Sequence, residues 1–330
     1  MLLQQQPITA GRGKVAVPTT LLEAIPDAPP HLLAQLYGPD APIGVYMLVD
    51  GSLWRDVAGI FDLDTIGLPA QCLFEGKAAE ESGETSPWLV DMSIPGPGNA
   101  GGLSFHRKFF ARHWPVGTSL LIQTDASFAA LRQHLRRFTQ LPVQDDGRMR
   151  LFRFWDPRVM HPFLTTIADD VARMRRMMMT DDGQPLNYII RDGETDICLL
   201  PDAGKLADTP VTPMRLHFAD FDPIASARAL ERRNRMVDRI CASFTHELEH
   251  RPRKAIEAAV DHALRLFGGY GFKTHAHLHF FAVWTVFFGP GFEARDPAGT
   301  LQEICRSSAP EAERFKAFRN RFDSFTMRAA

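Results

Sequence analysis

The sequence predicts an α/β N-terminal lobe, with a mixed sheet and flanking helices, followed by an all-α C-terminal lobe. Short apolar runs typical of strands alternate with helical patterns through the first 200 residues or so. From about residue 222 onward apolar residues recur every three or four positions, and no segment has the pattern of a strand. With 330 residues, of which 45% are hydrophobic, the chain is long enough to form two domains with cores of their own.

The first lobe is expected to follow a Pro-rich lead-in, residues 1–44, that holds a short helix at 31–36. Apolar runs predict buried strands at 45–50, 70–74, 88–92 and 119–123, and a helix at 54–61. The apolar spacing of residues 128–138 predicts a helix capped by Thr124 or Asp125. A further strand is expected from residue 151 to the turn at Pro157, and residues 186–191 and 195–200 are expected to form a β-hairpin around Asp192-Gly193-Glu194.

The second lobe is expected to contain helices alone. The polar segment 206–222, broken by prolines, is interpreted as a linker between an α/β domain at 45–205 and a helical domain at 223–330. One long helix is predicted from about residue 222 to the residue before Pro252. Two more are predicted at 254–267 and 274–288, each ending at a glycine, and the last helix carries Phe315, Phe318, Phe322 and Phe325.

Charge and cysteine content exclude several classes of protein. The 37 basic and 39 acidic residues give a net charge of -2, which argues against general attraction to nucleic acid or anionic lipid. The four cysteines lie far apart, so they indicate neither a zinc knuckle nor a secreted disulfide scaffold. The N-terminus lacks a signal-peptide pattern, and the most apolar run, 278–288, is too short to span a membrane. We therefore expect a soluble cytoplasmic protein without nucleic-acid or membrane partners.

Residues 151–159 form the most informative segment, Leu-Phe-Arg-Phe-Trp-Asp-Pro-Arg-Val. If the segment begins as a strand, Phe152 and Phe154 lie on one face, and Arg153 and Trp155 lie on the other. The two arginines, Arg153 and Arg158, are then expected to bracket Asp156 as a buried ion pair. Because structural networks also gather charge, we favour a structural role over a catalytic one.

An H-E-x-x-H motif occurs at residues 246–250. On a helix, His246 and His250 would lie one turn apart as zinc ligands, with Glu247 beside them as a base, which is the pattern of a zinc hydrolase. The third histidine of the extended motif is replaced by Ile256, and Pro252 ends the helix directly after the motif. A polar helix end is therefore the preferred interpretation, and a zinc-dependent hydrolase is the alternative.

Other candidate sites are weaker. Of His275, His277 and His279 only the first and third share a helix face, and two histidines do not complete a zinc site. A G-x-G-x-x-G pattern at 96–101 has a proline in its tight turn and is not followed by a helix, so a loop is expected. The sequence contains neither a Walker A motif nor a G-x-S-x-G elbow. We predict no catalytic residue, no bound metal and no cofactor.

The predicted long helix places several arginines away from its apolar stripe, among them Arg232, Arg235 and Arg239. Such a face is usually just solvated. It can also meet an acidic partner, in which case its charge sets partner choice and association rate. A nucleic-acid partner is a third possibility, and it would bind with strong salt dependence.

Five short motifs follow one another in a distinctive order: Leu48-Val49-Asp50-Gly51, Leu73-Phe74-Glu75-Gly76, Ser86-Pro87-Trp88-Leu89-Val90, Ala130-Leu131-Arg132-Gln133-His134-Leu135-Arg136-Arg137 and Phe152-Arg153-Phe154-Trp155-Asp156-Pro157-Arg158-Val159. In this order they resemble the bacterial type VI secretion adaptor family, also called effector chaperones. The resemblance covers roughly residues 45–200 and continues loosely at Gly289-Pro290-Gly291-Phe292 and Asp296-Pro297.

The resemblance implies a non-enzymatic protein that binds a secreted effector and assists its loading onto the VgrG spike. It implies an α/β lobe shared among members and a helical lobe that varies with the cargo. The residues that would organise the shared lobe are Asp50, Glu75, Arg153, Trp155, Asp156 and Arg158. Grooves between helices suit amphipathic segments of a partner, so the arginine face is a candidate cargo surface.

Overall fold

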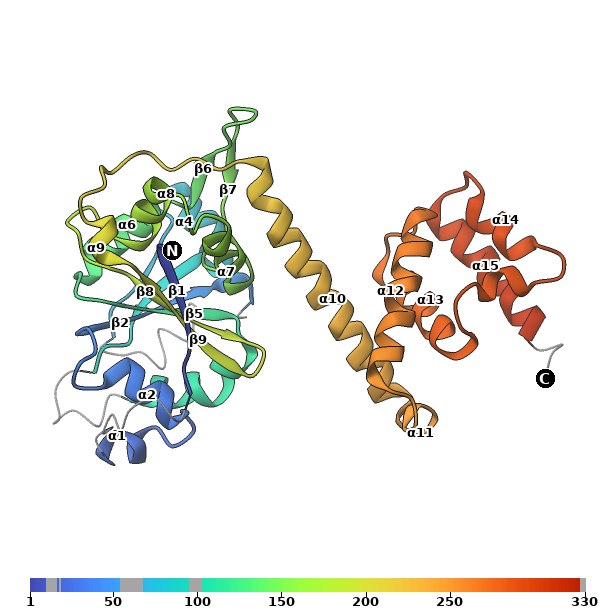
Figure 1. Cartoon of the computed structure of the whole chain (residues 1–330), viewed down its shortest axis with the longest axis horizontal. Coiled ribbons are helices and arrows are strands. Elements are labelled where there is room, and N and C mark those ends of the chain that lie inside the picture. Colours follow the sequence, from blue (N-terminus) through green and yellow to red (C-terminus); the bar gives the residue numbers. More distant parts are fainter. Residues whose placement is uncertain (10–16, 18, 54–67, 95–102, 327–330) are drawn as a thin grey trace. The chain divides into compact units, whose positions relative to one another are not determined.

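The computed structural model describes residues 1–9, 17, 19–53, 68–94 and 103–326 (Figure 1). The chain divides into two compact units, Met1–Ala225 and Ser226–Ala330. The first contains a seven-stranded sheet with helices, and the second is mostly helical, which confirms the predicted fold class. The helix expected at 54–61 and the loop expected around 96–101 lie outside the described residues.

The sheet contains strands from distant parts of the chain. Their order is β1 (Leu3–Pro7), β9 (Thr195–Pro201), β8 (Asn187–Asp192), β5 (Ser119–Thr124), β2 (Gly44–Asp50), β4 (Pro87–Asp91) and β3 (Ala70–Cys72). Each neighbouring pair is antiparallel, so the expectation of a mixed sheet is corrected. The alternation of strands and helices in the sequence does not distinguish a parallel crossover from an antiparallel return. The predicted β8–β9 hairpin is present.

The central strand β2 is buried along its whole length because helices cover both faces of the sheet. Tyr46 and Leu48 belong to a cluster with α6 (Phe128–Arg136), α7 (Pro157–Thr166) and α8 (Val171–Met178). Val45, Met47 and Val49 point to the opposite cluster, with α1 (Thr19–Ala24), α2 (Pro30–Tyr37) and α5 (Ser104–Lys108). Figure 1 shows these two helical layers on either side of the sheet. Burial on both faces explains why β2 has a continuous apolar run instead of an alternating one.

The lead-in and the expected linker both belong to the compact first unit. Residues 1–44 supply the edge strand β1 and the buried Leu32 and Leu36 of α2. Residues 206–222 follow the short helix α9 (Ala203–Leu206) and bury Met214 and Leu216 in the same cluster as α7 and α8. The predicted boundaries at 45 and 205 therefore do not coincide with the edges of this unit.

The cap of α6 differs from the prediction. Ser127 is the N-cap, and its hydroxyl accepts a hydrogen bond from the Ala130 N–H at 3.3 Å. Thr124 is still in β5, and Asp125 accepts a hydrogen bond from the Ile43 N–H, so neither of the predicted caps is free for the helix. Among the described residues, the remaining helices of the first unit are α4 (Lys77–Ser82) and the short helical turns η1 (Gly51–Leu53), η2 (Gly83–Thr85), η4 (Phe109–His113), η5 (Trp114–Val116) and η6 (Phe218–Asp220).

The helical unit is built around aromatic rings. It contains the continuation of α10 (Phe221–Ser243), then α11 (Thr245–Leu248), α12 (Arg253–Gly269), α13 (His275–Phe288), η7 (Phe292–Arg295), α14 (Thr300–Arg306) and α15 (Glu311–Thr326). Phe267 of α12 stacks on Phe281 of α13 at 3.8 Å, and Phe318 of α15 meets both rings edge on. The prediction of a single helix up to Pro252 is wrong, because Phe244 is not helical and separates α10 from α11.

A buried aspartate fixes the connection between α13 and α14. Asp296 accepts hydrogen bonds from the Arg321 Nε at 2.8 Å and from the N–H groups of Ala298 and Leu301 at 3.2 and 3.3 Å. Arg321, followed by these N–H groups, lowers the pKa of the Asp296 carboxyl to about 2. Since Arg321 belongs to α15, one carboxylate joins the connecting loop to the last helix.

We expect Asp296→Asn to destabilise the helical unit by about 2 kcal/mol at neutral pH. The folded pKa lies below the ordinary value of 3.8, so the stabilisation is present above that value and is lost as the pH falls through about 2. Urea unfolding followed by circular dichroism at several pH values measures the difference between wild type and variant, which should shrink towards zero on acidification. Glu303→Gln, at an exposed position of α14, is the control and should change little. A difference that stays constant down to the lowest pH would contradict this account.

Candidate functional site

Asp50, at the end of β2, lies at the centre of a polar cluster. Its side chain is buried and accepts hydrogen bonds from the Trp155 indole N–H and the Ser52 N–H, both at 2.9 Å. It also forms an ion pair with Arg153, which in turn donates to the Ser52 hydroxyl at 2.9 Å. The cluster therefore joins the end of a central strand to a segment that lies about a hundred residues later in the chain.

The expected strand at residue 151 ends almost at once. Only β7 (Met149–Leu151) is extended, paired with β6 (Gln140–Pro142). Phe152, Phe154 and Trp155 are all buried, so the predicted alternation of faces is wrong. The Asp156 N–H donates to the Arg153 carbonyl at 3.0 Å, and this turn directs the aromatic rings inward together.

The arginines do not bracket Asp156 as expected. Arg158 binds the Asp156 carboxylate through Nε at 2.8 Å and Nη2 at 3.0 Å, while Arg153 reaches Asp50 instead. Asp156 is also the N-cap of α7 and accepts a hydrogen bond from the Arg158 N–H at 3.0 Å. Pro157 occupies the first turn of that helix, where a missing N–H does no harm.

Glu75 forms a second connection, between the chain after β3 and helix α6. Its carboxylate lies 3.1 Å from Arg132 Nη1 and forms an ion pair with Arg136. The same arginines donate to main-chain carbonyls, Arg132 to Cys72 at 2.8 and 3.0 Å and Arg136 to Leu73 at 3.0 Å. Spacing by four residues places both guanidinium groups on one face of α6.

These contacts meet at one end of the sheet. The Gly51 N–H donates to the Ser86 carbonyl at 3.0 Å, and the Leu73 N–H donates to the Pro87 carbonyl at 2.9 Å. The ring of Phe74 meets Trp155 edge on, with centroids 6.1 Å apart. The five sequence motifs, although far apart along the chain, thus converge in space.

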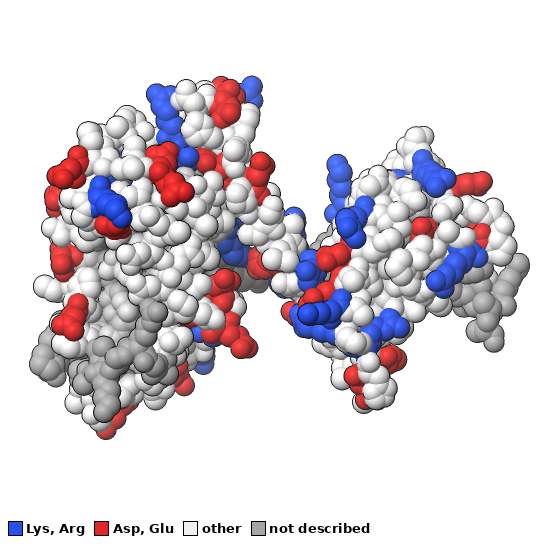
Figure 2. All heavy atoms as spheres, in the orientation of Figure 1, with Lys and Arg blue, Asp and Glu red and all other residues white. Residues whose placement is uncertain are grey.

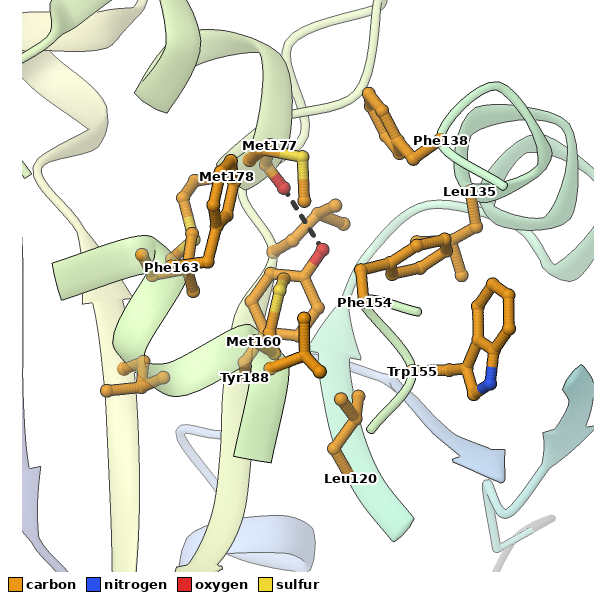
Figure 3. Packing of buried hydrophobic residues seen from close by; sticks show 14 of the residues in the cluster. Leu120, Leu135, Phe138, Phe154, Trp155, Met160, Phe163, Met177, Met178 and Tyr188 are labelled. Atoms are coloured by element: carbon orange, nitrogen blue, oxygen red, sulfur yellow. Dashed lines mark hydrogen bonds between the residues drawn. The ribbon is translucent and has the colours of Figure 1, made fainter. Parts of the chain in front are cut away.

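The apolar core continues directly from this cluster. Figure 3 shows Phe154 and Trp155 beside Leu135 and Phe138, and Phe154 meets Phe138 edge on at 5.9 Å. The dashed line in Figure 3 marks the Tyr188 hydroxyl, which donates to the Met177 carbonyl at 3.0 Å. The polar cluster and the hydrophobic core therefore fix the same aromatic segment from opposite sides.

A comparison with protein families finds a match within the first unit. Residues 45–173 match the family model described as Domain of unknown function (DUF4123). Residues 45–173, about two fifths of the chain, are its DUF4123 region. This domain is known in the type VI secretion adaptors that load effectors, which confirms the resemblance seen in the sequence. No curated protein and no solved structure matches the chain.

The DUF4123 match includes every residue predicted to organise the shared lobe, from Asp50 to Arg158. The prediction missed Ser52, Arg132 and Arg136, which complete the cluster. The two arginines have a detectable signal, since they lie four residues apart on the polar face of a predicted helix. The carboxylates of Asp50, Glu75 and Asp156 each accept hydrogen bonds from at least two donors, an arrangement typical of a structural network.

His134 of α6 was not singled out from the sequence. It is buried against the edge of Phe138, with ring centroids 5.0 Å apart. Burial, together with the nearby arginines, chiefly Arg176, lowers its pKa to about 3. The imidazole is therefore neutral and packs as part of the DUF4123 core.

Outside the DUF4123 domain, the residues of the H-E-x-x-H motif do not share one helix. His246 is exposed in α11, which ends at Leu248. His250 lies beyond that end, is 93% exposed and pairs with its neighbour Glu249 at 3.0 Å. His277 bonds Glu311 at 2.7 Å and stacks on Phe315. Within the part of the chain that the structure describes, no three His, Cys, Asp or Glu side chains are grouped as metal ligands.

The arginine face of α10 is exposed to solvent. Arg232, Arg235 and Arg239 are all exposed, and Arg235 lies 3.5 Å from Glu231. Arg233, in contrast, turns towards α12, where it lies 3.7 Å from Glu257 and 3.2 Å from Asp261. Residues 226–330 hold 17 Lys and Arg against 12 Asp and Glu. Figure 2 shows basic atoms spread over the visible face of this unit.

We expect Asp50 and Arg153 to be energetically coupled. Arg153→Ala should destabilise the DUF4123 domain by about 3 kcal/mol, because it leaves the buried Asp50 carboxylate without its charged partner. Asp50→Asn should cost less, because the Arg153 side chain is partly exposed and its charge is solvated. The double mutant should show a coupling energy of about 1 to 3 kcal/mol in urea unfolding experiments.

Two further measurements test the assignment of partners. Arg153→Ala and Asp156→Asn should be additive within about 0.5 kcal/mol, because their side chains share no bond. Arg150→Ala, which removes an exposed ion pair with Asp146, is the control and should cost less than about 1 kcal/mol. Strong coupling of Arg153 to Asp156 and none to Asp50 would restore the pairing expected from the sequence.

Proposed function

We propose that this protein is a non-enzymatic adaptor that binds a secreted effector and assists its loading onto the VgrG spike of a type VI secretion system. The observation that carries the proposal is the DUF4123 match over residues 45–173, because this domain is associated with an adaptor or chaperone role in type VI secretion. An adaptor of this kind acts in the cytoplasm, before secretion. In agreement, no helix among the described residues is long and apolar enough to cross a membrane.

The polar cluster of the DUF4123 domain supports a scaffolding role for its named residues. Asp50 and Glu75 bind arginines from distant parts of the chain, so they hold the lobe together, whereas Asp156 binds Arg158 in the first turn of the helix that it caps. Arg153 and Arg158 are 38% and 33% exposed, and only their outer edges are accessible to a partner. On this proposal the α/β adaptor domain presents surfaces that the cluster keeps rigid.

The helical unit is proposed to select the cargo. Its excess of basic residues favours an acidic partner, and several of its carboxylates are already engaged, among them Asp296 by Arg321 and Glu311 by His277. The exposed face of Arg232, Arg235 and Arg239 would then meet an acidic or amphipathic segment of the effector. Opposite charge would increase the association rate and help to exclude unsuitable partners.

The test is co-purification of the full chain with VgrG and with the effector encoded beside it. We expect the wild type to retain both proteins at moderate salt. The triple variant Arg232→Glu, Arg235→Glu, Arg239→Glu should retain VgrG but lose about tenfold or more in affinity for the effector, because three attractive contacts become repulsive.

A matched control reverses Arg265 and Arg306, two exposed arginines elsewhere in the same unit, and should leave effector binding nearly unchanged. Failure of the wild type to bind either protein at low salt would contradict the adaptor function. Binding of nucleic acid that weakens steeply with salt and disappears in the triple variant would favour a nucleic-acid partner for this face.

A further inference from the structure

The β6–β7 hairpin extends away from the seven-stranded sheet (Figure 1). One side of it is covered. The Leu216 N–H donates to the Pro142 carbonyl and the Gln144 N–H donates to the Leu216 carbonyl, at 3.0 and 2.8 Å, so the segment around Leu216 occupies the outer edge of β6. The other side of the hairpin is the outer edge of β7.

The register shows which main-chain groups face that edge. The Val143 N–H donates to the Arg148 carbonyl and the Phe152 N–H donates to the Thr139 carbonyl, at 2.9 and 3.0 Å. In an antiparallel pair the bonded positions alternate, so Arg150 also bonds β6 whereas Met149 and Leu151 turn their N–H and C=O groups outward. Among the described residues, no main-chain partner occurs for these outward groups.

The side chains of the same two residues are exposed as well. Met149 is 58% and Leu151 is 54% exposed, and both lie on one face of β7. Arg148 and Arg150 lie on the opposite face, where Arg150 is 5.8 Å from the ring centroid of the half-exposed Phe218. The unpaired N–H and C=O groups of a strand edge can pair with another chain, so this short edge can accept an added strand.

We propose that the outer edge of β7 is a docking site for an extended segment of a partner protein, which adds as a further strand. The segment would carry apolar residues facing Met149 and Leu151 and acidic residues facing Arg148 and Arg150. Main-chain hydrogen bonds supply affinity in this mode of recognition, and alternate side chains supply specificity. The inference concerns the DUF4123 domain and holds independently of the identity of the partner or of its cargo.

Charge decides between a partner protein and a second copy of this chain. From Arg148 to Arg153 the chain contains three arginines and no acidic residue, although Arg150 pairs with Asp146 in the hairpin turn and Arg153 pairs with Asp50. Pairing β7 with β7 of a second copy would bring arginines opposite or diagonal to one another, and like charges across strands are destabilising. An acidic segment forms favourable pairs on the same face.

The probe is a short fluorescein-labelled peptide in which valine alternates with glutamate, and binding is measured by fluorescence anisotropy at low salt. The same peptide with lysine in place of glutamate should bind at least about tenfold more weakly, because it faces Arg148 and Arg150 with like charge. Protein selectively labelled with 15N-methionine and 15N-leucine should show that the amides of Met149 and Leu151 shift and become protected from exchange only with the first peptide.

Two variants test the edge itself. Leu151→Pro removes an outward N–H without removing a bond to β6, and it should weaken peptide binding about tenfold. The double variant Met149→Asp, Leu151→Asp leaves the backbone intact and should weaken binding by a similar factor. Ile43→Asp, at another exposed apolar position of the same unit, is the control and should bind as wild type. Circular dichroism confirms that each variant is folded.

Equal binding of both peptides, or wild-type binding by the folded Asp double variant, would overturn the proposal. Concentration-dependent dimerisation of the free chain that Leu151→Pro abolishes would also overturn it, in favour of a second copy. The peptide experiment does not depend on an effector or a spike protein. A chain that binds the peptide but neither VgrG nor effector would therefore retain this docking site while losing the adaptor function.

Discussion

The architecture of the first unit depends on the hydrogen bonds and the ion pair that the buried Asp50 carboxylate forms. A carboxylate removed from water needs donors, and its donors include Trp155, Arg153 and the N–H of Ser52. Two of them come from a segment about a hundred residues away, so they are in place only when the turn before α7 has formed. The same turn buries Phe152 and Phe154, which couples the polar cluster to the core.

Local patterns predicted the elements of this fold well, and long-range partners poorly. The apolar run of β2 and the β8–β9 hairpin depend on neighbouring residues and were found where expected. The partner of Arg153 could not be predicted, because an arginine three residues from Asp156 has an obvious local candidate and no sequence signal points to Asp50. The local pattern of the H-E-x-x-H motif likewise predicts a continuous helix. In the structure the helix is interrupted at Phe244 and ends again at Leu248.

A similar ion pair, between Asp296 and Arg321, stabilises the helical unit. Asp296, like Asp50, is a buried carboxylate that binds an arginine from a later part of the chain. Asp296 lies in a loop, whereas Asp50 ends strand β2. In both units a buried carboxylate bound to an arginine stabilises the fold. Surfaces available to partners therefore lie elsewhere, on the exposed arginines of α10 and on the edge of β7.

The arginine face of α10 and the edge of β7 differ in the electrostatic field around them. Residues 1–225 hold 20 basic and 27 acidic residues, whereas residues 226–330 hold 17 and 12. An acidic segment approaching the helical unit is attracted from a distance, over roughly the Debye length of 8 Å at physiological salt. The same segment approaching β7 is repelled by the net negative charge of the first unit. Its interaction becomes favourable only when it contacts Arg148, Arg150 and the main chain of β7. Recognition at the strand edge must therefore rest on short-range hydrogen bonds and on the alternation of side chains, while charge steers binding to the arginine face of α10.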